Sequence, residues 1–254
     1  MGAGFDTTLL TRIEEAGINA SAPPEQRWVD GWLVRFSPGK AKRARCIQAV
    51  APGRLTVPDK LARCLPVYAT AGLRPYLRVT PFSEPAGLDR ELARLGWERI
   101  DDTRVMVARS LPTPAPVPEG FRVEPVDSAA FTRWIGTARG STTAEQAAHA
   151  RRVASSPVAY SALLIRDEGG NAVAGGQVAT EDEVAGLYDV FSHESHRGRG
   201  LARVICAALL QLARDAGATA GYLQVDASNE VARRLYGRLG FADAYAYHYR
   251  TPRS

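Results

Sequence analysis

Short apolar segments and longer amphipathic segments alternate along the second half of the chain, and this pattern predicts a sheet flanked by helices. Six short segments bounded by turn residues predict strands, over residues 121–126, 158–166, 172–180, 184–192, 220–225 and 241–249. Four longer segments predict helices, over residues 127–139, 142–155, 201–216 and 228–239. The order of these elements is typical of a mixed α/β or α+β domain with one central sheet.

Two of the predicted helices carry clear start or stop signals. Thr142 and Glu145 have the spacing of a capping box, which satisfies backbone N–H groups at the start of a helix. Gly217 is the stop signal of the helix over 201–216. The apolar stripe of that helix is formed by Leu201, Ile205, Leu209 and Leu212.

A proline-rich segment separates the two halves of the chain. A proline stands at every second position from 112 to 118, so the segment can neither continue a helix nor donate regularly to a sheet. We expect residues 111–120 to be a linker between an N-terminal domain, 1–110, and a C-terminal domain, 121–254.

A sequence pattern in the first half of the chain is repeated in the second half. A strand-like segment at 76–79 precedes Leu-Gly-Trp at 95–97, and a similar segment at 222–225 precedes Leu-Gly-Phe at 239–241. This repetition predicts an internal duplication, with two copies of one fold in tandem.

Composition narrows the class of protein. Of 254 residues, 45% are apolar and 23% are charged, which is typical of a globular chain and excludes wholesale disorder. The longest apolar run, at 204–210, is too short to span a membrane. The first residues lack the pattern of a signal peptide, and the three cysteines fit reduced thiols, so we expect a cytoplasmic protein.

The net charge of +5 is too small to indicate a nucleic-acid partner. The densest basic cluster is Lys-Ala-Lys-Arg-Ala-Arg at 40–45. This cluster fits a solvated loop and also fits a site for an acidic ligand, and both interpretations stay open. No group of cysteines and histidines has metal-ligand spacing, so we expect no metal.

The most specific motif is Ser-His-Arg-Gly-Arg-Gly-Leu-Ala at 195–202, between a predicted strand and a predicted helix. Gly198 and Gly200 allow a sharp turn and the close approach of a ligand to the backbone. Unpaired N–H groups at the start of the following helix favour an anion such as a pyrophosphate. The motif lacks the Gly-Lys-Ser/Thr ending of a triphosphate loop and the third glycine of a dinucleotide fingerprint.

Arg197-x-x-Gly200-x-Ala202 resembles the acyl-CoA pyrophosphate signature of the GNAT acetyltransferase superfamily. A second block agrees, with Asn229 followed by Leu-Tyr at 235–236 and Leu-Gly-Phe at 239–241. The resemblance covers residues 121–254. It implies the acyl-CoA N-acyltransferase fold, a mixed central sheet flanked by helices, with acetyl-CoA as co-substrate and a small-molecule or peptide amine as acceptor.

The resemblance also implies roles for individual positions. The residues implied to hold the acyl-CoA are Val190, Phe191, Ser192, Arg197, Gly198, Arg199, Gly200, Leu201, Ala202, Arg203 and Asn229. Tyr236 matches the tyrosine that protonates the departing CoA thiolate, and its hydroxyl, with a reference pKa of about 10, carries a proton at neutral pH.

The general base is less evident. Many GNAT members have a glutamate where this chain has Gln224, which cannot accept a proton. Asp189, on the strand before the loop, is the candidate in its place, and a structural hydrogen bond is the alternative role for its carboxylate. Asp226 and Glu181 are weaker candidates for the base.

The first half has Leu92 where the second has Tyr236, so we expect it to bind no CoA and to close one side of the acceptor cleft. Tyr245, Tyr247 and Tyr249 share one face of the last predicted strand and fit either an acceptor site or core packing.

The leading hypothesis is an N-acetyltransferase that works by direct attack of an amine in a ternary complex. The alternatives are a non-catalytic acyl-CoA-binding or sensor protein and an aminoacyl or peptide transferase of the tandem GNAT type. The sequence indicates neither the acceptor nor the oligomeric state.

Overall fold

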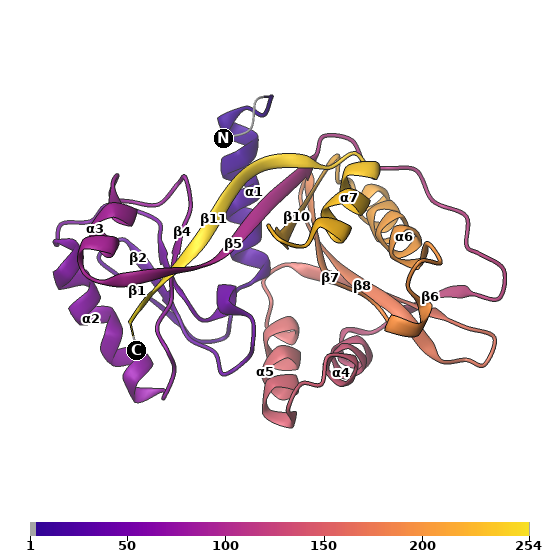
Figure 1. Ribbon diagram of the computed structural model, residues 1–254, viewed down its shortest axis with the longest axis horizontal. Coiled ribbons are helices and arrows are strands. Elements are labelled where there is room, and N and C mark those ends of the chain that lie inside the picture. The colour runs from indigo at the N-terminus through magenta and orange to yellow at the C-terminus, as the bar shows by residue number, and fades with distance from the viewer. Residues whose placement is uncertain (1–3, 254) are drawn as a thin grey trace.

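The computed structural model describes residues 4–253, and its strands form one mixed sheet in the order β1-β2-β3-β4-β11-β5-β10-β9-β8-β7-β6 (Figure 1). The strands are β1 Gln26–Val29, β2 Trp32–Arg35, β3 Ile47–Ala49, β4 Leu77–Val79, β5 Trp97–Ala108, β6 Arg122–Val126, β7 Ala159–Arg166, β8 Ala172–Glu181, β9 Val184–Ser192, β10 Ala220–Asp226 and β11 Ala242–Pro252. The α-helices are α1 Thr7–Ala20, α2 Val57–Thr70, α3 Leu88–Arg94, α4 Ser128–Ala138, α5 Thr143–Ala154, α6 Leu201–Asp215 and α7 Glu230–Arg238. Two short 3₁₀ turns are η1 Lys42–Ala44 and η2 Glu194–His196.

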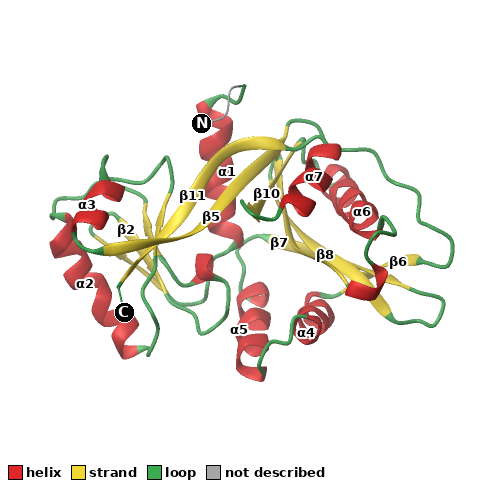
Figure 2. Ribbon diagram, in the orientation of Figure 1, coloured by secondary structure: helices red, strands yellow, loops and turns green. Residues whose placement is uncertain are grey.

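The second half of the chain has the predicted order of elements. The capping box at the start of α5 is present, because Thr142 accepts from the Glu145 N–H while the Glu145 carboxylate accepts from the Thr142 N–H. Helices cover both faces of this part of the sheet (Figure 2). Along β7, Leu163 and Ile165 join the core under α6, while Ala162 and Leu164 face α4, as strand alternation requires.

The sheet continues into the first half through an exchange of long strands. β5 pairs antiparallel with β10, so that Ala108 lies opposite Gly221. β11 pairs antiparallel with β4, so that His248 lies opposite Val79, and β5 and β11 also pair with each other (Figure 1). The last strand of each half therefore lies beside a strand of the other half.

The order β4-α3-β5 in the first half matches β10-α7-β11 in the second, where the internal repeat was noted. Residues 111–120 contain neither helix nor strand. They are held to α6, because Arg214 donates a 2.8 Å hydrogen bond to the Pro112 carbonyl. The division into two domains and the tandem duplication stay predictions.

Helix α1 packs between the two halves. Its apolar face, formed by Leu10, Ile13 and Ala16, joins a core that includes Tyr188 of β9 and Tyr222 of β10. The same core takes up Tyr245, Tyr247 and Tyr249, while Tyr247 and Tyr249 also line a cavity beside Gln224, so both interpretations of this face stay open. No helix within residues 4–253 is both long enough and apolar enough to cross a bilayer.

Candidate active site

The site is built where two neighbouring parallel strands separate. β9 and β10 pair only from Val184–Ala220 to Leu187–Leu223. Beyond Leu187, no strand of residues 4–253 lies on the β10 side of β9. A bulge on the other side of β9 accompanies the split, and Asp189 there has a φ of 52°, a left-handed conformation that is uncommon outside glycine. The backbone of Val190, Phe191 and Ser192 therefore borders an open gap in the sheet.

The glycine-rich loop follows directly after this gap. Gly198 and Gly200 have φ values of 78° and 77°, and α6 begins at Leu201. None of the N–H groups from Gly198 to Ala202 donates to an acceptor within the described chain. Together with the positive end of the helix dipole, these donors make a seat that fits a pyrophosphate.

The rest of the loop leaves the seat open. A Cβ added at either glycine would meet no atom within 4 Å. Arg197, Arg199 and Arg203 of the same segment are exposed, so the loop carries positive charge as well as free N–H groups. The loop residues predicted to hold the cofactor thus surround this seat, and their role in binding it stays a prediction.

Tyr236, on α7, is half-buried beside the core under α6. Burial raises the pKa of its hydroxyl, and the nearby Arg139 guanidinium opposes that shift only in part. The hydroxyl is therefore protonated at neutral pH and able to donate. Asn229 caps α7, because its side-chain oxygen accepts from the Ala232 N–H at 3.1 Å; its amide nitrogen stays available to donate to a ligand.

Asp189 is held by a cluster of donors from three elements. Its Oδ1 accepts from Arg139 Nη1 at 2.5 Å, and its Oδ2 accepts from Gln177 Nε2 at 3.2 Å. His149 Nε2 lies 3.3 Å from the same Oδ2. Burial favours a higher pKa for Asp189, but His149 and Arg139 outweigh it and hold the pKa well below its usual range. A carboxylate of such low basicity is a poor proton acceptor.

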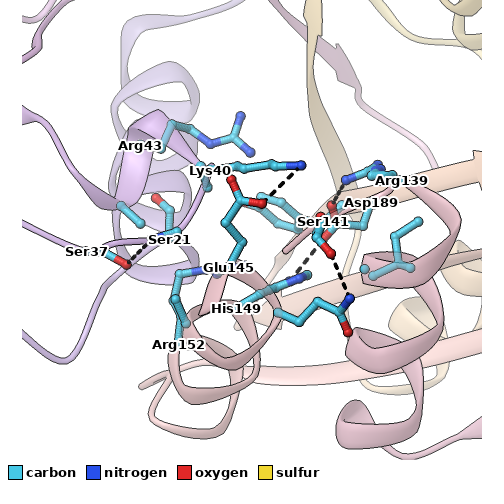
Figure 3. A pocket seen from close by; sticks show the side chains of 18 residues that line it. Ser21, Ser37, Lys40, Arg43, Arg139, Ser141, Glu145, His149, Arg152 and Asp189 are labelled. Atoms are coloured by element: carbon cyan, nitrogen blue, oxygen red, sulfur yellow. Dashed lines mark hydrogen bonds and ion pairs between the residues drawn. The ribbon is translucent and has the colours of Figure 1, made fainter. Parts of the chain in front are cut away.

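A cavity of about 290 Å³ lies beside this cluster, and we call it the Asp189 cavity. Figure 3 shows Lys40 and Arg43 of the first half facing Glu145, His149 and Arg152 of α5 across it. The first half therefore forms one wall of the cavity.

Gln224 stands on the β10 side of the gap. Its side-chain oxygen accepts hydrogen bonds from Arg43 Nη1 at 2.6 Å and from the Tyr247 hydroxyl at 2.8 Å. Arg43 thus connects the basic segment of the first half with the position where many GNAT members have a glutamate.

Residues 7–250 match a family described as "Probable histone acetyltransferase Rv0428c C-terminal". The chain belongs to this family. Its sequence is also 26% identical, over 232 residues, to the Bacillus subtilis (strain 168) protein named "Uncharacterized N-acetyltransferase YobR", covering 90% of this chain and 92% of that protein.

Solved structures agree on the fold of this Rv0428c-type chain. A GCN5-related N-acetyltransferase from Kribbella flavida aligns over 100% of this chain and 97% of its own, with a TM-score of 0.68 at 19% identity. A tandem GNAT protein from the clavulanic acid biosynthesis pathway covers 93% of this chain and 86% of its own, with a TM-score of 0.62 at 14% identity. The GNAT resemblance and the acyl-CoA N-acyltransferase fold are confirmed, and the chain is an acetyltransferase of the GNAT type.

Sequence reasoning about this GNAT chain missed Arg139, His149 and Arg152. One signal was available, because Glu145, His149 and Arg152 repeat at i, i+4 and i+7 and so share a face of α5. His149 and Arg152 are turned inward on that face, to the Asp189 cavity. The basic segment at 40–45 fits both interpretations, since Lys42 pairs with the partly exposed Asp101 while Arg43 lines the cavity.

Proposed function

We propose that the chain transfers an acetyl group from acetyl-CoA to an amine by direct attack in a ternary complex. The observation that carries this proposal is the run of free N–H groups from Gly198 to Ala202 beside the gap between β9 and β10. The N–H groups of this seat would hold the pyrophosphate of acetyl-CoA, and the backbone of Val190–Ser192 on the free edge of β9 would hold the pantetheine arm. When bound, acetyl-CoA supplies the thioester carbonyl that the amine attacks, and an N–H group of this edge polarises that carbonyl.

His149 is the proposed general base, and Asp189 is its positioning residue. An imidazole nitrogen can accept the proton of an attacking amine, whereas a carboxylate whose pKa lies well below its usual range is a poor acceptor. His149 Nε2 lies 3.3 Å from Asp189 Oδ2 but makes no aligned hydrogen bond within residues 4–253, and we assign Nδ1 as the proton acceptor. Asp189 keeps a place in the proposed mechanism, as the carboxylate beside the imidazole.

Two proton transfers accompany the proposed transfer of the acetyl group from CoA to the amine. The bond between the amine nitrogen and the acetyl carbon forms while the carbon–sulfur bond breaks. The amine proton goes to His149, and the Tyr236 hydroxyl donates its proton to the departing thiolate. Arg139 is near both centres, since it donates to Asp189 and also lowers the pKa of Tyr236.

Calorimetric titration with acetyl-CoA tests the proposal, combined with an assay of thiol release across an amine panel. One site per chain with amine-dependent thiol release supports it. Binding without thiol release for any amine favours an acyl-CoA-binding or sensor protein instead. Absence of binding at millimolar acetyl-CoA contradicts both.

We propose a reducing compartment, the cytoplasm, as the location. Cys46, Cys64 and Cys206 are all buried free thiols. Burial raises the pKa of Cys46 and of Cys64 to about 11, which keeps both thiols protonated and unreactive.

A further inference from the structure

The charges that line the Asp189 cavity do not balance. Four cationic side chains line it, Lys40, Arg43, Arg139 and Arg152, against two acidic ones, Glu145 and Asp189. Lys40 pairs with Glu145 at 3.2 Å, and Arg139 pairs with Asp189 at 2.5 Å. These two pairs use both carboxylates, so two guanidinium groups are left over.

The two remaining arginines have neutral partners. Arg43 donates to the Gln224 side-chain oxygen at 2.6 Å, and its buried Nε has no acceptor within residues 4–253. Arg152, only 7% exposed, donates to the Ala20 carbonyl at 3.1 Å. A buried charge is costly unless an opposite charge compensates it. Arg43 and Arg152 therefore both line the Asp189 cavity without an ion pair to a carboxylate within residues 4–253.

Resting on the proposed function, we infer that the Asp189 cavity binds the acceptor through an anionic group, so that the substrate is an amine that also carries a carboxylate. Arginine binds carboxylates with two parallel hydrogen bonds, which suits Arg43 and Arg152 to this task. The cavity volume of about 290 Å³ leaves room for a small ligand of amino-acid size.

The same charges act on the reacting amine. Nearby positive charge disfavours an ammonium group, so the arginines help the bound amine to lose its proton. With its carboxylate at Arg43 and Arg152, the acceptor directs its amine to His149 and Asp189, on the cavity wall next to the gap. A polycationic acceptor, such as a lysine-rich peptide tail, meets repulsion in this cavity.

A kinetic comparison of matched acceptors tests the inference. Thiol release with acetyl-CoA is measured for glycine, leucine, phenylalanine and glutamate, each against its α-carboxamide. We expect kcat/KM for the acids to exceed that of the amides by at least about tenfold, the effect of one hydrogen bond to a charged group. Equal rates, or faster amides, overturn the inference while leaving the acetyltransferase function in place.

Two variants distinguish an effect of the cavity residue Arg152 from an effect of the net charge of the protein. Arg152→Gln is expected to remove most of the preference for acids. Arg151→Gln, a change of the exposed neighbouring residue on α5, removes the same charge and is expected to keep the preference. If the two variants behave alike, Arg152 does not bind the acceptor and the assignment is overturned.

A binding measurement covers the case in which Arg152→Gln does not fold or no amine of the panel is acetylated. The N-acetylated forms of the same amino acids and amides, which cannot react further, are titrated into the wild-type complex with CoA. Tighter binding of the acids by about tenfold or more supports the inference. Absence of binding by every acid at millimolar concentration overturns it. Loss of CoA binding, measured separately, marks instead a failure of the proposed function.

Discussion

Arg43 Nη1 donates a 2.6 Å hydrogen bond to the side-chain oxygen of Gln224. The two residues come from opposite halves of the chain and meet at the edge of the gap between β9 and β10. Because Gln224 is neutral, the hydrogen bond positions Arg43 without compensating its charge. The glutamine therefore preserves the cationic character of the Asp189 cavity.

Replacing this glutamine by glutamate tests that role. In Gln224→Glu, Arg43 gains an ion pair and holds the new carboxyl in its ionised form. We expect the variant to lose preference for acidic acceptors by about tenfold, with no gain in kcat from the added carboxylate. Steady-state kinetics on the acid and amide pairs measures both effects; a higher kcat would show that position 224 acts as a base here too.

Tyr236→Phe removes the proposed proton donor and keeps the ring. No side-chain hydrogen bond among residues 4–253 acts on its hydroxyl, so the fold is expected to tolerate the loss. We expect kcat to fall by about 10²-fold or more, as for other general acids, with acetyl-CoA affinity little changed. An unchanged kcat would exclude Tyr236 from the chemistry.

Gly200→Glu places a side chain and a negative charge in the phosphate seat, at a φ of 77°. We expect acetyl-CoA binding to disappear in calorimetry. Gly217→Glu is the matched control, since Gly217 follows the other end of α6 with a φ of 103° and open space around it. Equal binding by both variants would remove the loop from the cofactor site.

His149→Gln tests the base. We expect kcat to fall by about 10²-fold, the typical contribution of a general base. Acetyl-CoA affinity, measured on the same preparation, is expected to stay constant, which separates chemistry from binding. An unchanged kcat would assign the proton transfer to another group or to water.

The ionised Asp189 carboxylate contributes to the free energy of unfolding, and this contribution depends on pH. Its pKa is lower in the folded state than the usual value of about 3.9, so its stabilisation is complete above about pH 4 and is lost as the pH falls through the folded-state pKa. We expect Asp189→Asn to lower the free energy of unfolding by about 1–3 kcal/mol at pH 7, since Arg139 and His149 lose their anionic partner. Urea unfolding at about pH 7 and about pH 3 is the measurement. A gap between the two proteins that stays constant with pH would contradict the assigned pKa.

Local patterns predicted most of the second half of the fold and the phosphate seat. The helix start at Thr142, the helix end at Gly217 and the glycines of the loop each act on neighbouring residues, so the sequence shows them directly. Gly198 and Gly200 take up the left-handed conformations for which glycine is best suited.

Local sequence patterns could not predict that β5 and β11 pair with strands of the other half, nor which residues line the Asp189 cavity. Periodicity shows which face of a strand is apolar but not which distant strand lies beside it. Arg43 and His149 are brought together only by the tertiary fold, from segments about a hundred residues apart in the sequence. Basic residues in a short segment look alike in sequence whether they face solvent, as Lys42 does in part, or a cavity, as Arg43 does.

The pairing of β5 and β11 with strands of the opposite half affects how this chain folds during its synthesis. During synthesis, β5 leaves the ribosome well before β10, so Ala108 is exposed until Gly221, its partner, has been translated. β4 likewise waits for β11, which is almost the last segment to appear. The first half is therefore expected to stay incomplete on the nascent chain, with an unprotected strand edge that chaperones must shield. Cutting the linker between 111 and 120 would give two fragments that each need the other to close their sheets.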